Sequence, residues 1–192
     1  LSALLSLAGK GTGDSCFAGT SAMVTVVTPT LNAAEYIEAT LRSVASERGD
    51  AVEHLVVDGG SVDETAAIVG RFPHARLVAL PGSHQSTAMN YGASIARGAF
   101  LVFLNADDVL VPGGLGVLLS AFVKNSELDV AYGRAQHVDT AGDVIEPYVT
   151  RDFEAGALLE HCFICQAATM IRRTSFERAG GFSNSLDFAM DY

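Results

Sequence analysis

Phe100-Leu-Val-Phe-Leu-Asn-Ala-Asp-Asp108 is the stretch of sequence that decides the fold. It begins within residues 99–104, the longest uninterrupted apolar run of the chain, and it ends on two adjacent carboxylates. A short apolar run of this kind is typical of a strand that is buried on both faces. We therefore expect residues 100–104 to form a central strand, with Asp107 and Asp108 beyond its carboxyl end.

Strand and helix patterns alternate on both sides of this stretch. Further strands are expected at residues 23–28, 52–57, 76–80, 130–132 and 167–171. Helices are expected at residues 34–44, 61–72, 86–97 and 113–124. The first two of these helices have capping boxes, formed by Asn32 with Glu35 and by Ser61 with Glu64. Strands that alternate with helices form a mostly parallel sheet with helices on both faces, so the expected fold class is α/β.

The composition is that of a globular protein that does not bind polyanions. The chain has 192 residues, of which 49% are hydrophobic and 18% charged, so it can bury the core of a domain. The 12 Lys and Arg against 22 Asp and Glu give a net charge of −10, which argues against nucleic acid or an anionic membrane surface as the partner. Three cysteines are too few for a disulfide scaffold, and no apolar run is long enough to span a membrane.

Both ends of the sequence suggest a fragment. The chain begins with Leu1, and its apolar residues 1–8 lack the basic segment that precedes a secretory signal. Residues 9–22 are rich in Gly, Ser and Thr, so we expect an irregular arm over residues 1–21. The sequence stops at Tyr192 without a closing helix, and we expect it to be truncated there.

Polar or small residues follow three of the expected strands. They are residues 28–30, 58–60 and 105–108. In open α/β sheets, ligands bind beyond the carboxyl ends of the strands. These three segments are therefore the expected walls of a binding site.

Asp107 and Asp108 need an explanation, because adjacent carboxylates repel each other and are costly to desolvate. One explanation is a solvated turn or a helix cap before Pro112. The other is a site for Mg²⁺ or Mn²⁺, which accept one or two protein carboxylates and fill their other positions with water and substrate phosphate oxygens. The sequence has no Gly-rich loop with a Lys to cradle phosphate, so a divalent ion would let this acidic chain hold a diphosphate.

Several segments resemble the motifs of family 2 glycosyltransferases, which have the GT-A fold. Those that resemble the three opening motifs are Val24-Thr-Val-Val-Thr-Pro-Thr-Leu-Asn32, Val57-Asp-Gly-Gly-Ser-Val-Asp-Glu-Thr65 and Phe103-Leu-Asn-Ala-Asp-Asp108. The later ones are Gln85-Ser-Thr-Ala-Met-Asn-Tyr-Gly92, the acceptor-side segment with Cys165-Gln166 and Gly180-Gly181-Phe182, and Met190-Asp191-Tyr192, which resembles the acidic motif that carries the catalytic base. The resemblance covers residues 22–192 and implies a GT-A-like, Rossmann-type sandwich.

The resemblance implies a nucleotide diphosphate sugar as donor (UDP-, GDP- or TDP-linked), a hydroxyl acceptor and a divalent metal, Mg²⁺ or Mn²⁺. In this interpretation Asp107 and Asp108 bind the metal. The nucleotide contacts are assigned to Thr28, Pro29, Thr30, Asn32, Asp58, Gly59, Asn90, Asn105 and Ala106. Asp191 matches the base that deprotonates the acceptor hydroxyl, in a transfer that inverts the anomeric carbon.

The sequence departs from the family pattern at four places. Asn105 stands where the family usually has the first Asp of its DxD motif, and an amide adds no charge for a metal. Gly59 replaces a second Asp that reads the base in many members, which leaves uracil recognition open. Residues 80–87 contain no Lys or Arg for the diphosphate, and Thr87 replaces an acid.

The resemblance also implies a division of the chain and a biological setting. Residues 22–110 would form the nucleotide-sugar-binding half and residues 111–192 the acceptor-side half. The acceptor would be a glycan, a lipid-linked sugar or a small molecule, in bacterial cell-envelope polysaccharide biosynthesis. The expected location is the cytoplasm, either free or peripheral at the inner membrane face, and the oligomeric state is open.

Two other functions stay open at this point. A nucleotidyltransferase that forms sugar nucleotides would need a basic Gly-rich loop soon after the first strand, and residues 31–35 do not provide one. The other alternative is a non-catalytic nucleotide-binding domain, which would keep the nucleotide contacts but would not need a catalytic base.

Overall fold

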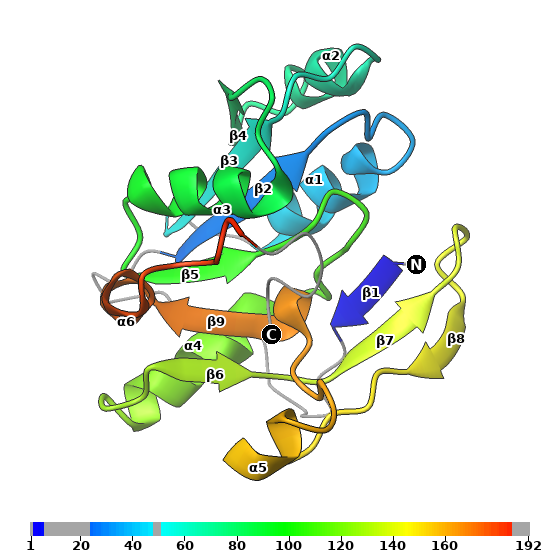
Figure 1. Cartoon of the computed structure of the whole chain (residues 1–192). Helices are drawn as coiled ribbons and strands as arrows, with labels where there is room; N and C mark the ends of the chain where they lie inside the picture. Colours follow the sequence, from blue (N-terminus) through cyan, green and yellow to red (C-terminus); the bar gives the residue numbers. More distant parts are fainter. Residues whose placement is uncertain (1, 6–23, 48–50, 186–192) are drawn as a thin grey trace.

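The computed structural model describes residues 2–5, 24–47 and 51–185. Within these residues the larger sheet has six strands in the order β4-β3-β2-β5-β9-β6 (Figure 1). Their bounds are β2 (Val24–Thr30), β3 (Val52–Asp58), β4 (Ala75–Ala79), β5 (Phe100–Phe103), β6 (Val130–Tyr132) and β9 (Thr169–Arg172). The pairs β2–β3, β2–β5 and β3–β4 are parallel, whereas β9 is antiparallel to β5 and β6. The prediction of a mostly parallel sheet is confirmed.

Helices cover both faces of this sheet (Figure 1). Because side chains alternate along a strand, Val26 and Val27 of β2 point to opposite faces. On the Val27 face lie α3 (Gln85–Ser94) and α6 (Arg173–Ala179), which share one apolar cluster with it. On the other face lie α1 (Ile37–Ser46) and α4 (Gly114–Lys124), which cluster with Val26, while α2 (Thr65–Val69) packs beside α1. The chain therefore has the predicted sandwich of helices and sheet.

The first two helices begin later than the predicted capping boxes require. α1 begins at Ile37 and α2 at Thr65, and neither has a side-chain hydrogen bond from its N-cap residue. Asn32 has a positive φ of 50° and lies in the turn before α1. At α2, Asp63 Oδ1 instead accepts hydrogen bonds from the backbone N–H and the hydroxyl of Thr65. Both predicted capping boxes are therefore wrong.

A second, smaller sheet was not expected from the sequence. It pairs β1 (Ser2–Leu5), β7 (Ala135–Val138) and β8 (Val144–Pro147), all antiparallel (Figure 1). β1 lies within residues 1–21, for which an irregular arm was expected. Every residue of β8 is exposed, so this strand carries no alternation of buried and exposed residues that would predict it.

The remaining helical segments are short. α5 (Ala155–Leu158) has no buried residue, and the 3-10 turn η1 (Gln166–Ala168) leads into β9. No helix within residues 2–5, 24–47 and 51–185 combines the length and the apolar character that crossing a bilayer requires.

Glu47 joins α1 to α4 through a buried carboxylate. The N-cap of α4 is Gly113, which has no side chain to satisfy the first backbone N–H groups of the helix. Glu47 supplies the acceptors, with Oε1 receiving Gly113 N–H at 2.6 Å and Oε2 receiving Leu115 N–H at 3.0 Å. Burial raises the pKa of this carboxyl, and the backbone hydrogen bonds oppose that rise. A residue near the end of one helix thus caps the start of another.

Gly92 lets α3 lie directly on β2 and β3. A Cβ atom at this position would lie 2.4 Å from Val27 Cγ1 and 3.3 Å from Val57 Cγ2. Both valines are fully buried, so neither can move aside without disturbing the sheet. The absence of a side chain at residue 92 therefore sets the distance between α3 and the sheet.

His54 and Thr28 form a buried polar pair between β3 and β2. The His54 Nε2 and Thr28 Oγ1 atoms are 2.9 Å apart, and both residues are almost completely buried. Burial, with the nearby ring of His74 as a second cause, lowers the pKa of His54 to about 3. His54 is therefore neutral in the folded protein at any pH near neutrality.

We predict that Gly92→Ala lowers the free energy of unfolding by about 1–3 kcal/mol, because the added methyl group overpacks a rigid interface. Chemical denaturation measures this change. The matched control is Gly116→Ala in α4, where a Cβ would meet no atom within 4 Å. That control should raise stability by about 0.5–1 kcal/mol, the usual helix preference for Ala over Gly. Equal effects of the two changes would contradict the close approach of α3.

We also predict that His54 makes the protein sensitive to acid. The folded pKa of about 3 lies below the ordinary value of 6.5, so between these pH values the unfolded chain binds a proton that the folded chain does not. Stability is therefore lost as pH falls from 6.5 toward 3. In His54→Gln, the slope of unfolding free energy against pH should decrease by up to about one proton in this range. The exposed His161→Gln serves as the control, and an equal change of slope there would contradict the assignment.

Candidate active site

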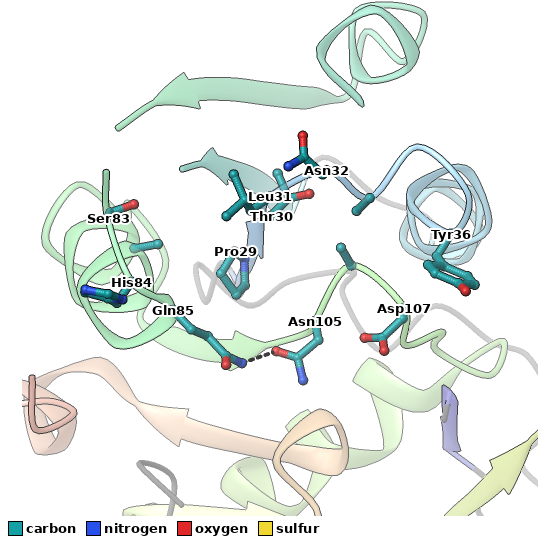
Figure 2. Close-up of a pocket in the computed structure, with 13 residues that line it drawn as sticks. Pro29, Thr30, Leu31, Asn32, Tyr36, Ser83, His84, Gln85, Asn105 and Asp107 are labelled. Carbon is teal, nitrogen blue, oxygen red and sulfur yellow. Dashed lines mark hydrogen bonds between the residues drawn. The ribbon is translucent and has the colours of Figure 1, made fainter. Parts of the chain in front are cut away.

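A cavity of 570 Å³ opens where the carboxyl ends of β2 and β5 meet the start of α3 (Figure 2). Three segments line it. They are residues 29–33 with Tyr36 after β2, residues 83–85 with Ala88 at the start of α3, and residues 105–107 after β5. The cavity therefore lies at the edge of the sheet where the sequence predicts ligand binding.

Of the two acids predicted to bind metal, one lines the cavity. Asp107 is partly exposed and belongs to the cavity wall. Asp108 is buried, with 6% of its surface exposed, and is not among the lining residues. Burial, with the charge of Asp108 as a second cause, raises the pKa of the Cys165 thiol to about 11.

A buried hydroxyl of α1 holds the turn that carries these acids. Thr40 Oγ1 lies 2.8 Å from the carbonyl oxygen of Ala106 and 2.8 Å from that of Asp108. Thr40 is fully buried, so the turn is attached to the core. This contact fixes the backbone on both sides of Asp107.

Asn105 belongs to a group of three side-chain amides. Its Oδ1 accepts a hydrogen bond of 2.7 Å from Gln85 Nε2, the bond drawn in Figure 2, and a longer one of 3.4 Å from Gln166 Nε2. Gln166 Nε2 also lies 3.3 Å from the carbonyl oxygen of Phe103. The amide expected to replace the first acid of the metal motif is thus held by residues from α3 and η1.

The first predicted nucleotide segment is split between the cavity and the core. Pro29, Thr30 and Asn32 line the cavity, whereas Thr28 is fully buried and paired with His54. The amide of Asn32 is partly occupied, because its Oδ1 accepts a hydrogen bond from Val62 N–H at 2.9 Å. The end of β2 and the turn that follows it therefore form part of the cavity wall.

Asp58 and Gly59 shape the turn beside the cavity and are not among its lining residues. Asp58 is buried, and its Oδ1 accepts hydrogen bonds from Ser61 Oγ at 2.6 Å, Ser61 N–H at 3.0 Å and Gly60 N–H at 3.3 Å. Gly59 donates its N–H to the Thr30 carbonyl at 2.9 Å. A Cβ at Gly59 would lie 3.2 Å from the carbonyl oxygen of Ser83. A larger residue at position 59 would therefore press on the 80–83 turn.

Asn90 holds a later segment of the chain and does not line the cavity. Its Oδ1 accepts Phe182 N–H at 2.9 Å, and its Nδ2 donates to the Phe182 carbonyl at 2.8 Å. Gly181, at a φ of 75°, leaves room for this pair, since a Cβ there would lie 2.6 Å from Asn90 Oδ1. The amide predicted to face the nucleotide instead joins α3 to the segment after α6.

The predicted catalytic base, Asp191, lies outside the described residues. The predicted contacts that do line the cavity are Pro29, Thr30, Asn32, Asn105, Ala106 and Asp107. The cavity is also lined by Tyr36, Ser83, His84 and Gln85, which were not among the predicted site residues. Three of these residues could have been found from their position, because Ser83, His84 and Gln85 immediately precede the expected helix at residues 86–97.

Polar and apolar residues both line the cavity, and among those described none is Lys or Arg. Hydrogen bonding to Glu35, and the charges of Glu35 and Asp107, raise the pKa of Tyr36, which therefore keeps its phenolic proton. Two lining hydroxyls, on Thr30 and Ser83, are buried without a hydrogen-bond partner in the described protein. Unpaired buried hydroxyls are uncommon, and these two lie beneath the cavity wall rather than on its surface.

The oxygen ligands that the cavity offers fit a hard divalent cation that takes most of its other ligands from a substrate. Within the described ranges, no group of three or more His, Cys, Asp and Glu could hold a metal ion by itself. Asp107 supplies one carboxylate to the cavity. Mg²⁺ in nucleotide-binding enzymes uses one or two carboxylates together with water and phosphate oxygens, and one acid is enough for that arrangement.

Relatives of the chain are longer than it is. A glycosyltransferase of PGL/p-HBAD biosynthesis from Mycobacterium tuberculosis is 33% identical over 171 residues, which are 84% of this chain and 63% of the relative. A chondroitin synthase from Pasteurella multocida is 25% identical over 179 residues, which are 88% of this chain and 18% of that enzyme. The chain thus spans less than two thirds of each relative.

Solved structures share the fold. Residues 1–349 of Staphylococcus aureus TarS, in complex with UDP, superpose with a TM-score of 0.73 at 22% identity, over 88% of this chain and 52% of that one. The mannosyltransferase PcManGT from Pyrobaculum calidifontis, in complex with GDP-Man and Mn²⁺, gives 0.63 at 22% identity, over 83% of this chain and 47% of that one. The sequence model described as glycosyl transferase family 2 matches residues 25–180, and the chain belongs to that family.

Proposed function

We propose that this chain binds a nucleotide diphosphate sugar in the cavity and transfers the sugar to a hydroxyl acceptor. The observation that carries the proposal is the position of Asp107 in the wall of the cavity at the carboxyl ends of β2 and β5. Family membership supports the reaction, and the UDP, UDP-GlcNAc and GDP-Man complexes of TarS and PcManGT support a nucleotide sugar as donor. The nucleobase of the donor could be uracil, guanine or thymine.

In this proposal Asp107 holds a divalent cation, Mg²⁺ or Mn²⁺, together with the diphosphate of the donor. When bound, such an ion stabilises the negative charge that develops on the leaving diphosphate. The Mn²⁺ complex of PcManGT supports this assignment. Asp108 would act indirectly, by its position in the turn behind Asp107.

The segments around the cavity would hold the nucleotide. Pro29 and Thr30, at the end of β2, lie where the base and ribose would enter, and Asn32 and Asn105 offer polar groups on either side (Figure 2). Thr28, Asp58, Gly59 and Asn90 would support these segments from behind.

Asp191 is proposed as the general base. A sugar hydroxyl is a weak nucleophile, and a positioned carboxylate can remove its proton while the new C–O bond forms. The bond between the anomeric carbon and the diphosphate breaks at the same time, and attack from the opposite face inverts the anomeric carbon. The proposed acceptor is a hydroxyl of a glycan, a lipid-linked sugar or a small molecule.

We predict that Asp107→Asn removes the part of nucleotide affinity that depends on metal. Calorimetric titration with UDP, GDP and TDP, each with and without Mn²⁺, measures it. For the nucleotide that binds, Mn²⁺ should tighten binding to the unmodified chain by at least about tenfold and to Asp107→Asn by less than about twofold. Asp143→Asn, on an exposed turn between β7 and β8, is the control and should behave like the unmodified chain. Binding that ignores Mn²⁺ in the unmodified chain would refute the metal site.

We predict that Asp191→Asn leaves nucleotide affinity unchanged and slows sugar transfer by at least about a hundredfold, the usual contribution of a general base. Donor affinity and transfer rate are measured on the same preparation. Asp187→Asn, four residues earlier, is the matched control. If Asp187→Asn causes the loss and Asp191→Asn does not, the base has been assigned to the wrong acid.

A further inference from the structure

We propose that Gln85 is a positioning residue that turns the amide of Asn105 so that its N–H groups, and not its carbonyl oxygen, face the donor. The inference rests on the proposed function, because it concerns the same cavity. It assigns a role to a residue at the first position of α3 that the sequence analysis did not include in the site.

The hydrogen bonds of Asn105 determine which of its atoms can meet a ligand. An amide oxygen has two acceptor positions, and Asn105 Oδ1 receives Gln85 Nε2 at 2.7 Å and Gln166 Nε2 at 3.4 Å. Within the described part of the chain, no hydrogen bond of Asn105 Nδ2 to a protein acceptor is found. The nitrogen therefore keeps its two N–H donors, while the oxygen is already saturated.

The direction of the amide matters because of the charge around it. The lining residues include the carboxylate of Asp107 and, among those described, no Lys or Arg. A diphosphate or a ribose hydroxyl offers oxygen acceptors, so an N–H donor at residue 105 would bind the nucleotide directly. An oxygen turned into the cavity would instead add a ligand for the cation and repel the diphosphate. Gln85 thus determines whether residue 105 serves the nucleotide or the metal.

Gln85 can have this role because it is held by the fold. It is the first residue of a ten-residue helix whose position on the sheet is set by Gly92. Asn105 follows β5, and Gln166 begins η1. The three amides therefore come from three rigid elements, and Gln85 provides the shorter of the two bonds to Asn105 Oδ1 (Figure 2).

The test exploits the opposite chemistry of glutamate. In Gln85→Glu, the carboxylate can only accept hydrogen bonds, so it should draw Asn105 Nδ2 toward itself and turn the oxygen into the cavity. Affinity for the nucleotide selected from UDP, GDP and TDP should fall about tenfold without metal, the size expected for a hydrogen bond to a charged group. The factor by which Mn²⁺ tightens binding should rise. Gln85→Met, which is neutral and cannot donate, should lose about threefold in metal-free affinity.

A double-mutant cycle separates this effect from added charge. In an Asn105→Ala background, the loss caused by Gln85→Glu should shrink to about threefold or less, because no amide remains to be turned. The same loss in both backgrounds would mean that charge alone acts, and it would overturn the proposal. Repeating the cycle with the 2′,3′-dideoxy nucleotide identifies the ligand atom that accepts the hydrogen bond from Asn105. The coupling between residues 85 and 105 disappears if a ribose hydroxyl accepts that bond, and it persists if a phosphate oxygen does. Failure of all three nucleotides to bind the unmodified chain would refute the proposed function itself.

Discussion

The parallel pairing of β2 with both β3 and β5 is the interaction on which the site depends. It aligns Val27 with Phe103 and Thr30 with Asp58, so three chain segments leave the sheet at the same edge. The backbone continues these contacts past the strands, since Leu104 N–H reaches the Val27 carbonyl at 3.0 Å and Gly59 N–H reaches the Thr30 carbonyl at 2.9 Å. The cavity lies directly beyond these bonds. Polar side chains that are far apart in sequence thereby face one space.

Acidic groups near this edge have distinct tasks because their surroundings differ. Asp58 and Asp63 accept hydrogen bonds from the backbone of their own turns, and Glu47 caps α4. Such hydrogen bonds stabilise the charged form of a carboxylate. Asp107 is the acid that reaches the cavity wall, on a turn attached to Thr40. Although the chain has an excess of acidic residues, few of their charges line the cavity. The cavity can therefore accept one cation together with a diphosphate.

The sequence predicted the sheet, the helices on both faces and the edge that carries the cavity, because these follow from apolar runs and their spacing. It did not predict the β7–β8 hairpin, whose outer strand has only exposed residues, or the true starts of α1 and α2, the second of which has Asp63 in place of the expected cap. At the site, two residues singled out by their type, Asp107 and Asn105, line the cavity, and their roles stay predictions. Thr28 and Asn90 could not be placed this way, since their partners His54 and Phe182 are distant in sequence.

The packing at Gly59 limits how the nucleotide preference of this protein could change. The position where many relatives are expected to carry an acid is closed here by the carbonyl of Ser83, and the Gly82 N–H donates to the Gly59 carbonyl at 2.9 Å. A single substitution to aspartate would meet the backbone of that turn. At a contact of 3.2 Å, the 80–83 turn would have to shift by a few tenths of an ångström to admit that side chain, so any change of residue 59 is tied to the conformation of this turn.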